Sequence, residues 1–316
     1  HLCQASTKNA GFACFGSPSE ILHDMSIMGE KDCLDLFQLR IDGIRNIKKL
    51  ASVSSFSYQD CQAFEWFTRD YWDLYDKTTG QLDSLNKLLT NGDSHSYYRH
   101  RKKTQGDVKE IEIIGEGQIN PAQLHEVLLK KAHKIGVDVI SPFRVVAMNA
   151  DGVEGENGIF LKSKIVINAS NALTGLLNFE HDVKPARAQV ILTSELKNLP
   201  IQGNYHMNEG YYYFRNVGNR LLMGGGRHLA IETETTYKQG LNPEILEDLQ
   251  AIMRDVLGIR EPINMAYKWS GIMGMRADKW PRINEDNGVW NIAGMSGMGV
   301  ALSFSLPNKL IEKLGI

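Results

Sequence analysis

The sequence lacks the features that would point to a membrane or to a nucleic acid. No uninterrupted apolar run is long enough to cross a bilayer, and no secretory signal opens the chain. Neither sign of charge dominates, because the chain has 35 Lys and Arg residues and 37 Asp and Glu residues, which gives a net charge of −2. This balance gives no electrostatic footprint for bulk nucleic-acid or membrane binding. We therefore expect no membrane and no nucleic-acid partner.

Cysteines are few and are not spaced for a metal or a disulfide framework. The four cysteines, Cys3, Cys14, Cys33 and Cys61, lie in the first fifth of the chain without any C-x-x-C spacing. Such cysteines are typical of reduced thiols in a cytoplasmic protein. The nine histidines show no metal spacing either. We expect a cytoplasmic protein with no metal site.

The chain also lacks internal repeats, low-complexity tracts and Pro-rich linkers. Its 316 residues leave room for two domains, which must then interleave rather than follow one another. The chain opens on His1, and its first residues are small and polar rather than strand-like. We expect that its natural beginning is missing.

Apolar spacing predicts the main helices. Residues 18–89 are mostly helical in period, with apolar residues three and four apart; examples are Ile21, Met25 and Met28, then Phe64, Phe67 and Tyr71. Asn120-Pro121 begins a second helix, which Gly136 ends, and Asn242-Pro243 begins another that runs to about Leu257.

Strand-like runs follow the second helix. They cover residues 137–140, 143–148, 159–162 and 164–169. Farther on, residues 210–215 and 220–223 form a predicted hairpin around the turn at 216–219. Helices and strands in this order predict a sheet layered with helices.

A glycine-rich turn near the end of the chain is the most informative segment. Residues 294–300 read Gly-Met-Ser-Gly-Met-Gly-Val, after a strand-like run at 289–293 and before an apolar helical tail. A strand, a glycine turn and a helix start place backbone N–H groups against an anionic group. Taken alone, a tight packing turn without ligand explains the segment slightly better.

Further segments along the chain resemble one family. Residues 6–11, 115–121, 165–172 and 269–274, the last with Asp278 and Pro281 and followed by 296–299, occur in that family's order. They resemble FAD-dependent amine and amino-acid oxidases of the D-amino-acid oxidase, glycine oxidase and sarcosine oxidase type. The resemblance covers nearly the whole chain. No single segment is decisive, but their order makes the flavin interpretation the better one.

The resemblance implies an α/β (α+β) fold. A FAD-binding Rossmann-like domain (1–30, 115–186 and 270–316) would interleave with an antiparallel-sheet substrate domain (31–114 and 187–269). The family's opening βαβ unit with G-x-G-x-x-G has no counterpart after His1. We expect this unit to be absent and the FAD domain to be incomplete.

The resemblance also assigns the cofactor residues. Backbone at residues 296–300 would face the flavin ring, since side chains at Gly297 and Gly299 would keep the backbone away from it. Residues 6–11 would contact the ribityl chain and phosphates, and Val145 with the segment near Ala169 would contact the adenosine half. The implied set is Ser6, Thr7, Lys8, Asn9, Ala10, Gly11, Val145, Ala169, Asn171, Gly271, Gly274, Ser296, Gly297, Met298, Gly299 and Val300.

The substrate side departs from the family. Where glycine-oxidase-like relatives carry a carboxylate-binding arginine, four residues after Trp269, this chain has Met273. Residues 220–224 hold no lysine that would assist oxygen, and no cysteine lies near Met273 for covalent attachment. We therefore expect non-covalent FAD and leave the electron acceptor open.

Four residues are candidates for the substrate face: Tyr211, Tyr213, Met273 and Arg227. Alternating tyrosines are more often packing residues, although one of the two could line the site. Arg227 could hold a substrate carboxylate, yet an exposed arginine at a strand end is the more common case.

The sequence thus predicts an FAD-dependent oxidoreductase that oxidises the C–N bond of a small amine or amino acid by hydride transfer to flavin N5. A cofactor-free fragment or non-catalytic remnant of such an enzyme is the alternative. A tRNA-modifying relative is a third, supported only by the basic stretch at residues 95–103, which is more typical of a solvated loop. The oligomeric state stays open.

Overall fold

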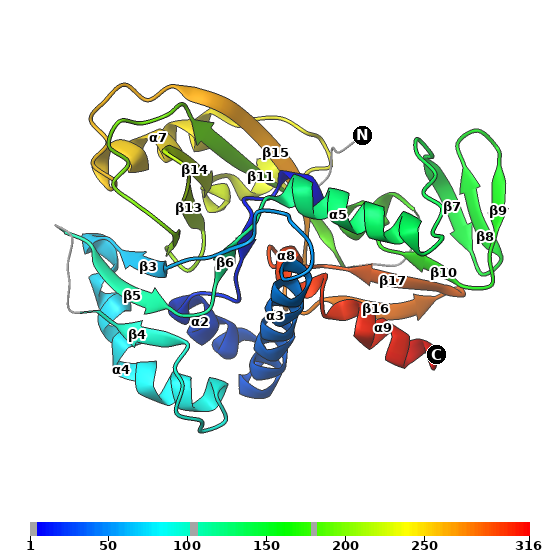
Figure 1. Cartoon of the computed structure of the whole chain (residues 1–316), viewed down its shortest axis with the longest axis horizontal. Helices are drawn as coiled ribbons and strands as arrows, with labels where there is room; N and C mark the ends of the chain where they lie inside the picture. The colour runs from blue at the N-terminus through cyan, green and yellow to red at the C-terminus, as the bar shows by residue number, and fades with distance from the viewer. Residues whose placement is uncertain (1–4, 102–106, 178–181) are drawn as a thin grey trace.

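The computed structural model describes residues 5–101, 107–177 and 182–316. One large sheet occupies the left of Figure 1, two smaller sheets built from residues 145–168 and 282–293 lie on the right, and α3 (Glu30–Ala51) stands between them.

The large sheet has eight strands. Their spatial order is β15 (Met265–Met275), β11 (Lys184–Thr193), β14 (Arg220–Gly225), β13 (Tyr212–Val217), β12 (Asn204–Met207), β3 (Ala63–Phe67), β5 (Lys109–Ile113) and β4 (Tyr98–His100). Neighbours are antiparallel except β12 and β3, which are parallel. The predicted hairpin is confirmed as β13–β14, with Val217 opposite Arg220.

Three sheets of three strands complete the strand content of the described residues. They are β1 (Phe12–Ala13), β6 (Gly117–Gln118) and β2 (Gln59–Asp60); β7 (Val145–Asn149), β8 (Gly152–Gly155) and β9 (Phe160–Lys162); and β10 (Val166–Asn168), β17 (Val289–Ala293) and β16 (Arg282–Asp286). β10 and β17 are parallel, so β17 brings residues 294–300 to the same edge as the end of β10.

The remaining helices are α1 (Ala5–Lys8), α2 (Pro18–Met28), α4 (Trp72–Leu89), α5 (Pro121–Lys134), α6 (Ile231–Glu234), α7 (Pro243–Asp255), α8 (Gly299–Leu302) and α9 (Leu306–Leu314), with 3₁₀ turns η1 (Arg69–Tyr71), η2 (Asn171–Leu176) and η3 (Arg227–Ala230). The helix starts predicted at Asn120 and Asn242 are confirmed, because each side chain accepts backbone N–H groups of the first turn. Within the described ranges, none of these helices has the length and apolar character needed to span a bilayer.

Two sequence-based predictions of secondary structure are wrong. Residues 63–67 form the buried strand β3 rather than a helix, because both faces of this strand are covered and its apolar residues imitate a helical spacing. Residues 137–140 form no strand, since no neighbouring strand in the described part of the chain pairs with them, and Ile140 is 58% exposed. The sequence also missed β8, whose ends are glycines, and the helix expected near Gly297 is the short α8 followed by α9.

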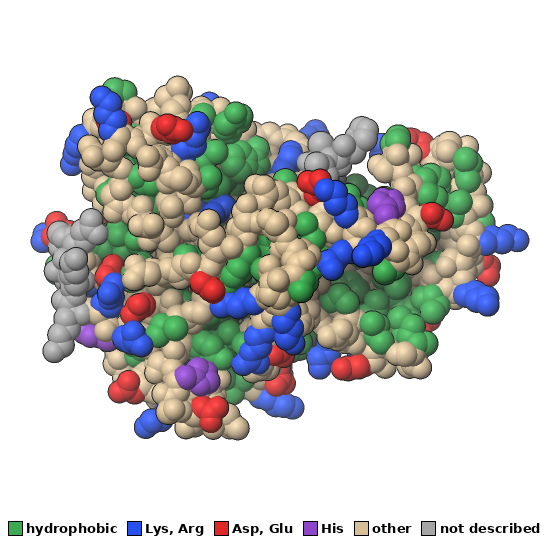
Figure 2. Space-filling model, viewed as in Figure 1, with side chains coloured by type: hydrophobic (Ala, Val, Ile, Leu, Met, Phe, Trp, Pro, Cys, Tyr) green, Lys and Arg blue, Asp and Glu red, His purple; other side chains and the backbone are tan. Residues whose placement is uncertain are grey.

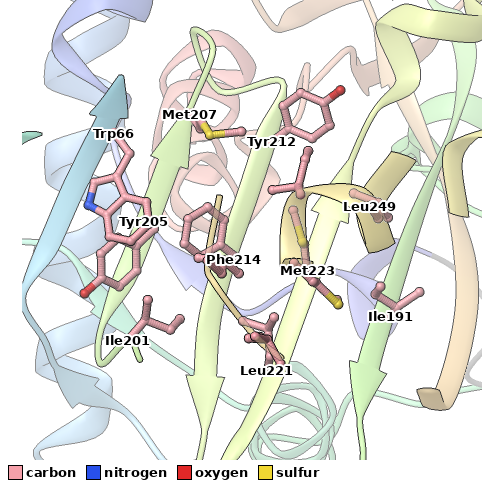
Figure 3. Packing of buried hydrophobic residues seen from close by; sticks show 14 of the residues in the cluster. Trp66, Ile191, Ile201, Tyr205, Met207, Tyr212, Phe214, Leu221, Met223 and Leu249 are labelled. Atoms are coloured by element: carbon pink, nitrogen blue, oxygen red, sulfur yellow. The ribbon is translucent and has the colours of Figure 1, made fainter. Parts of the chain in front are cut away.

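The main hydrophobic core lies between the large sheet and α7 (Figure 3). Side chains of alternate positions interdigitate there, with the rings of Tyr205 and Phe214 stacked at 5.1 Å. On the opposite face of the sheet, Val190, Leu222 and Trp269 pack with Phe12 and Met298. That second face joins the sheet to the glycine turn.

The architecture confirms the expected mixed α/β fold. Strands of the large sheet come only from residues 63–113 and 184–275 among those described, and the β10–β17–β16 sheet comes from 166–168 and 282–293. The two groups of segments interleave along the chain. The domain boundaries themselves stay a prediction.

Candidate functional site

Residues 294–300, the glycine turn, are tied to the end of β15. The Ser296 amide donates to the Gly274 carbonyl oxygen at 2.9 Å, and the Arg276 amide donates to Ser296 Oγ at 3.3 Å. Ser296 and Gly297 both have positive φ, 45° and 85°. This backbone path suits glycine at 297 and turns the chain sharply between β17 and α8.

The segment after β10 joins the same cluster through one asparagine. Asn171, with φ of 53°, accepts the Gly294 amide on its Oδ1 at 2.9 Å. A Cβ at Gly274 would collide with that oxygen. Glycine at 274 is therefore needed for the approach of η2 to β15 and the glycine turn.

The N-terminal turn, residues 6–11, lies on the other side. Trp269 Nε1 donates to the Lys8 carbonyl oxygen at 2.8 Å, and Met298 Sδ lies 3.7 Å from Cys14 Sγ. Arg215 fixes the turn to the sheet by donating to Ala10 O, Ile119 O and Gln118 Oε1. The structure thus brings together all the segments that were selected from the sequence.

Gly297 is the residue of this cluster that fits a flavin ring. A Cβ at Gly297 would meet nothing within 4 Å, so open space lies beside it. Its amide makes no hydrogen bond among the described residues. An unused N–H group beside open space suits the electron-rich pyrimidine edge of a flavin.

Several predicted cofactor residues are engaged within the protein. Asn9 Nδ2 donates to the carbonyls of Ala5 and Ser6, and its Oδ1 accepts the Gly11 amide at 2.9 Å. Lys8 Nζ donates to Gln239 Oε1 at 2.8 Å. In this structure these two side chains shape the N-terminal turn.

Three other predicted cofactor residues have different surroundings. Val145 is in β7, which Figure 1 places on the far right, away from the large sheet. Ala169 is exposed just after β10, and Val300 packs toward the cluster of Ala13 and Phe56. The contacts predicted for these three residues stay predictions.

The two tyrosines of the substrate face differ in their surroundings. Tyr213 packs edge-on against Phe12, with ring centroids 5.8 Å apart, and burial raises its pKa to about 12. Tyr211 precedes β13, is 46% exposed, and its ring lies 4.7 Å from that of His228. Tyr213 therefore faces the glycine turn from the sheet, whereas Tyr211 lies at its rim.

The other two candidates for the substrate face, Met273 and Arg227, lie in β15 and at the start of η3. Met273 lies opposite Ala186, two residues beyond Gly271 and so on the same face of β15. Arg227 is partly buried, its Nε is buried with no hydrogen-bond partner among the described residues, and burial lowers its pKa. An arginine held in this way is available to an anionic group of a ligand.

Sequence reasoning missed a buried set of ionisable residues behind β1. It comprises Glu20, Asp24, Arg40, Glu65, Glu116 and His206, which are buried, together with Lys279, whose side chain is 24% exposed. His206 Nε2 lies 3.0 Å from Glu116 Oε2, and the His206 ring contacts Phe12. Burial opposes the charged form of His206, but Glu116 outweighs it and raises the pKa. The available signal was a charged residue, Glu65, between the aromatic residues Phe64 and Trp66.

A cysteine close to the glycine turn in space, Cys14, is far from Met273 in the sequence and was not predicted. Cys14 is buried and touches Met298 of the glycine turn. Burial raises the pKa of its thiol well above the usual value, and Glu116 and Glu20 add to the effect. The thiol is therefore protonated at neutral pH and a poor nucleophile.

Comparison with known proteins gives the fold and the family. No curated protein matches the sequence. Among solved structures, glycine oxidase from Geobacillus kaustophilus matches with a TM-score of 0.74 and 16% identity over 98% of this chain and 85% of that one. L-proline dehydrogenase from P. horikoshii has the same score and identity over 88% and 78%. L-α-glycerophosphate oxidase from Mycoplasma pneumoniae, with FAD bound, matches with a TM-score of 0.72 and 14% identity over 99% and 85%.

These structural likenesses show the fold. The sequence itself matches a family model described as FAD dependent oxidoreductase over residues 2–306. This match spans nearly the whole chain and all the segments that meet at the glycine turn. The chain belongs to the FAD-dependent oxidoreductase family.

Proposed function

We propose that the protein oxidises the C–N bond of a small amine or amino acid, with FAD held non-covalently. The observation that carries the proposal is the convergence of the N-terminal turn, β15 and the glycine turn beside the unused amide of Gly297. The flavin, when bound, supplies a hydride acceptor at its N5. The protonated Cys14 thiol supports non-covalent attachment.

The protein's own residues position the substrate and exclude water. Tyr213, Leu222 and Trp269 give the sheet an apolar face toward Met298. The Gly297 amide would donate to the electron-rich edge of a bound flavin and stabilise negative charge there. Because position 273 holds methionine instead of the expected arginine, Arg227 takes the role of pairing with a substrate carboxylate. No strong base is needed, since the amine reacts in its neutral form.

Anaerobic mixing tests the proposal. The protein is incubated with FAD, desalted and mixed with a panel of primary amines, secondary amines and amino acids while flavin absorbance is followed. Bleaching by at least one C–N substrate is expected. Arg227→Met should weaken the binding of amino acids and so slow the bleaching that they cause. Bleaching by simple amines should be unchanged. Failure of the whole panel to bleach a retained flavin contradicts the proposal.

A cofactor-free remnant is the second candidate. The observation that favours it is the internal engagement of Lys8 and Asn9, two side chains expected at the phosphates. Flavin content separates the two candidates, because a remnant stays colourless after incubation with FAD.

A further inference from the structure

A pocket apart from the candidate flavin site lies between α9, β16 and the loop that joins β15 to β16. Its volume is about 490 Å³. Figure 1 shows α9 running beside β16. Among the described residues that line this pocket, none was assigned to the cofactor or to the substrate. Arg276 joins the pocket to the glycine turn, because a Cβ at Gly294 would collide with its methylene groups.

Two arginines of the pocket are held in place by acids. Arg276 and Arg282 both donate to Asp182, and Arg276 also donates to both carboxylate oxygens of Asp278. The side chains of the two arginines are 14% and 28% exposed. Their charges are balanced by the two acids, so this part of the pocket does not by itself attract an anion.

Two lysines that line the same pocket have no such partners. Lys309 and Lys313 are exposed and lie one turn apart in α9. Within the residues that the structure describes, neither makes an ion pair or a hydrogen bond, and Glu312, the one acid of α9, pairs with neither. Like charges one turn apart destabilise a helix slightly. The pocket therefore has two positive charges that a bound anion would compensate.

Trp280 gives the pocket an aromatic surface. It is partly buried and packs in one cluster with Ile283 and Leu306, which also line the pocket. An indole ring and two ammonium groups in one pocket supply both parts of a site for a flat organic anion, namely apolar contact for its ring and charge for its acidic group. An inorganic anion would use the lysines alone.

We propose that this pocket binds a small organic anion that carries a flat ring, such as an aromatic carboxylate. Lys309 and Lys313 hold the carboxylate, and Trp280 packs against the ring. The site lies outside the candidate flavin site and does not rest on the proposed function.

Calorimetry with a matched pair of ligands tests the proposal. 1-Naphthoate and 1-naphthamide share the ring system and differ in the negative charge. The wild-type protein should bind naphthoate more tightly than naphthamide by about 5-fold or better, as expected for two exposed charge pairs.

Variants of α9 locate the effect. Lys309→Gln combined with Lys313→Gln should bring the ratio of the two dissociation constants close to one without weakening naphthamide. The matched control is Lys130→Gln combined with Lys134→Gln, which removes two exposed lysines one turn apart in α5 and should keep the wild-type ratio. Both double variants remove the same charge, so the comparison separates a local contact from the net charge of the chain.

Arg227→Met separates this pocket from the proposed substrate site. A naphthoate bound by Arg227 would be lost in this variant, whereas one bound at α9 should keep the wild-type ratio. No naphthoate binding, a wild-type ratio near one, an unchanged ratio in the α9 double variant, or a ratio lost in Arg227→Met overturns the proposal, whatever the flavin does. Naphthoate binding through α9 in a protein that retains no flavin supports this site and contradicts only the proposed function.

Discussion

Glu65 shows how a single buried side chain couples the sheet to the site. It lies in the middle of β3 and is fully buried. It accepts hydrogen bonds from Ser17 Oγ, the Ser19 amide and Ser19 Oγ at the start of α2. Burial nevertheless raises its pKa from 4.5 to about 7. The folded protein therefore holds a proton that the unfolded chain has released at pH 6.

This raised pKa predicts that stability falls as pH rises from about 4.5 to about 7. The folded state binds the proton more tightly, so the loss attributable to Glu65 approaches ~1.4 kcal/mol per pH unit inside this window. His206, whose pKa is also raised, adds a loss of the same sign. Urea unfolding of wild type and Glu65→Gln at pH 5 and pH 7.5 isolates the Glu65 part. Parallel pH dependence in the two proteins would contradict the assignment.

At the scale of elements, α3 and α8 make a close contact that holds the segment after the glycine turn. Gly43 is in the middle of α3, and a Cβ there would collide with the backbone carbonyl of Ala301 in α8. Gly80, in the middle of α4, has nothing within 4 Å of its Cβ position. The two helical glycines therefore have different reasons to be glycine.

Gly43→Ala should destabilise the protein by about 1–3 kcal/mol, because the added methyl group forces α3 and α8 apart. Gly80→Ala should stabilise it by about 0.5–1 kcal/mol through helix propensity. Urea denaturation of both variants gives the comparison. Equal effects of the two substitutions would argue against the close contact.

Arg215 connects β13 with the N-terminal turn and β6. Its guanidinium donates to Ala10 O, Ile119 O and Gln118 Oε1, and burial lowers its pKa to about 10. Arg215→Lys keeps the charge but loses the planar fork, so a loss of about 2–3 kcal/mol is expected. Arg220→Lys, at a partly exposed pair with Glu195, serves as control and should change stability by less than about 0.5 kcal/mol. Thermal unfolding is the measurement, and similar losses in both variants would refute this role.

The sequence predicted helix starts and turns well where a single residue determines the local backbone. Asn120 and Asn242 cap helices, and Gly218 permits the β13–β14 turn. The strand β3 was missed because its apolar residues face two layers, so periodicity alone could not separate it from a helix. Residues 137–140 have strand composition but no strand partner in the described part, and composition cannot supply one.

At the scale of the whole molecule, the order of the segments predicted the family and which backbone turns meet. The side chains behind them could not be predicted. Glu116, His206 and Cys14 come from separate parts of the chain, and their contacts depend on the register of β12 and on the packing of the glycine turn against Cys14. Figure 2 shows positive and negative side chains interspersed on the visible face, so surface charge gives no further guide to a partner.

We propose that the glycine turn and the segments around it form a flavin site. The most direct measurement is a visible absorption spectrum of the purified chain, taken after incubation with FAD and desalting. Flavin bands should stay with the protein, and a bulky side chain at the open position, Gly297→Leu, should remove them while the fold persists by circular dichroism. A wild-type chain that emerges folded and colourless would contradict it.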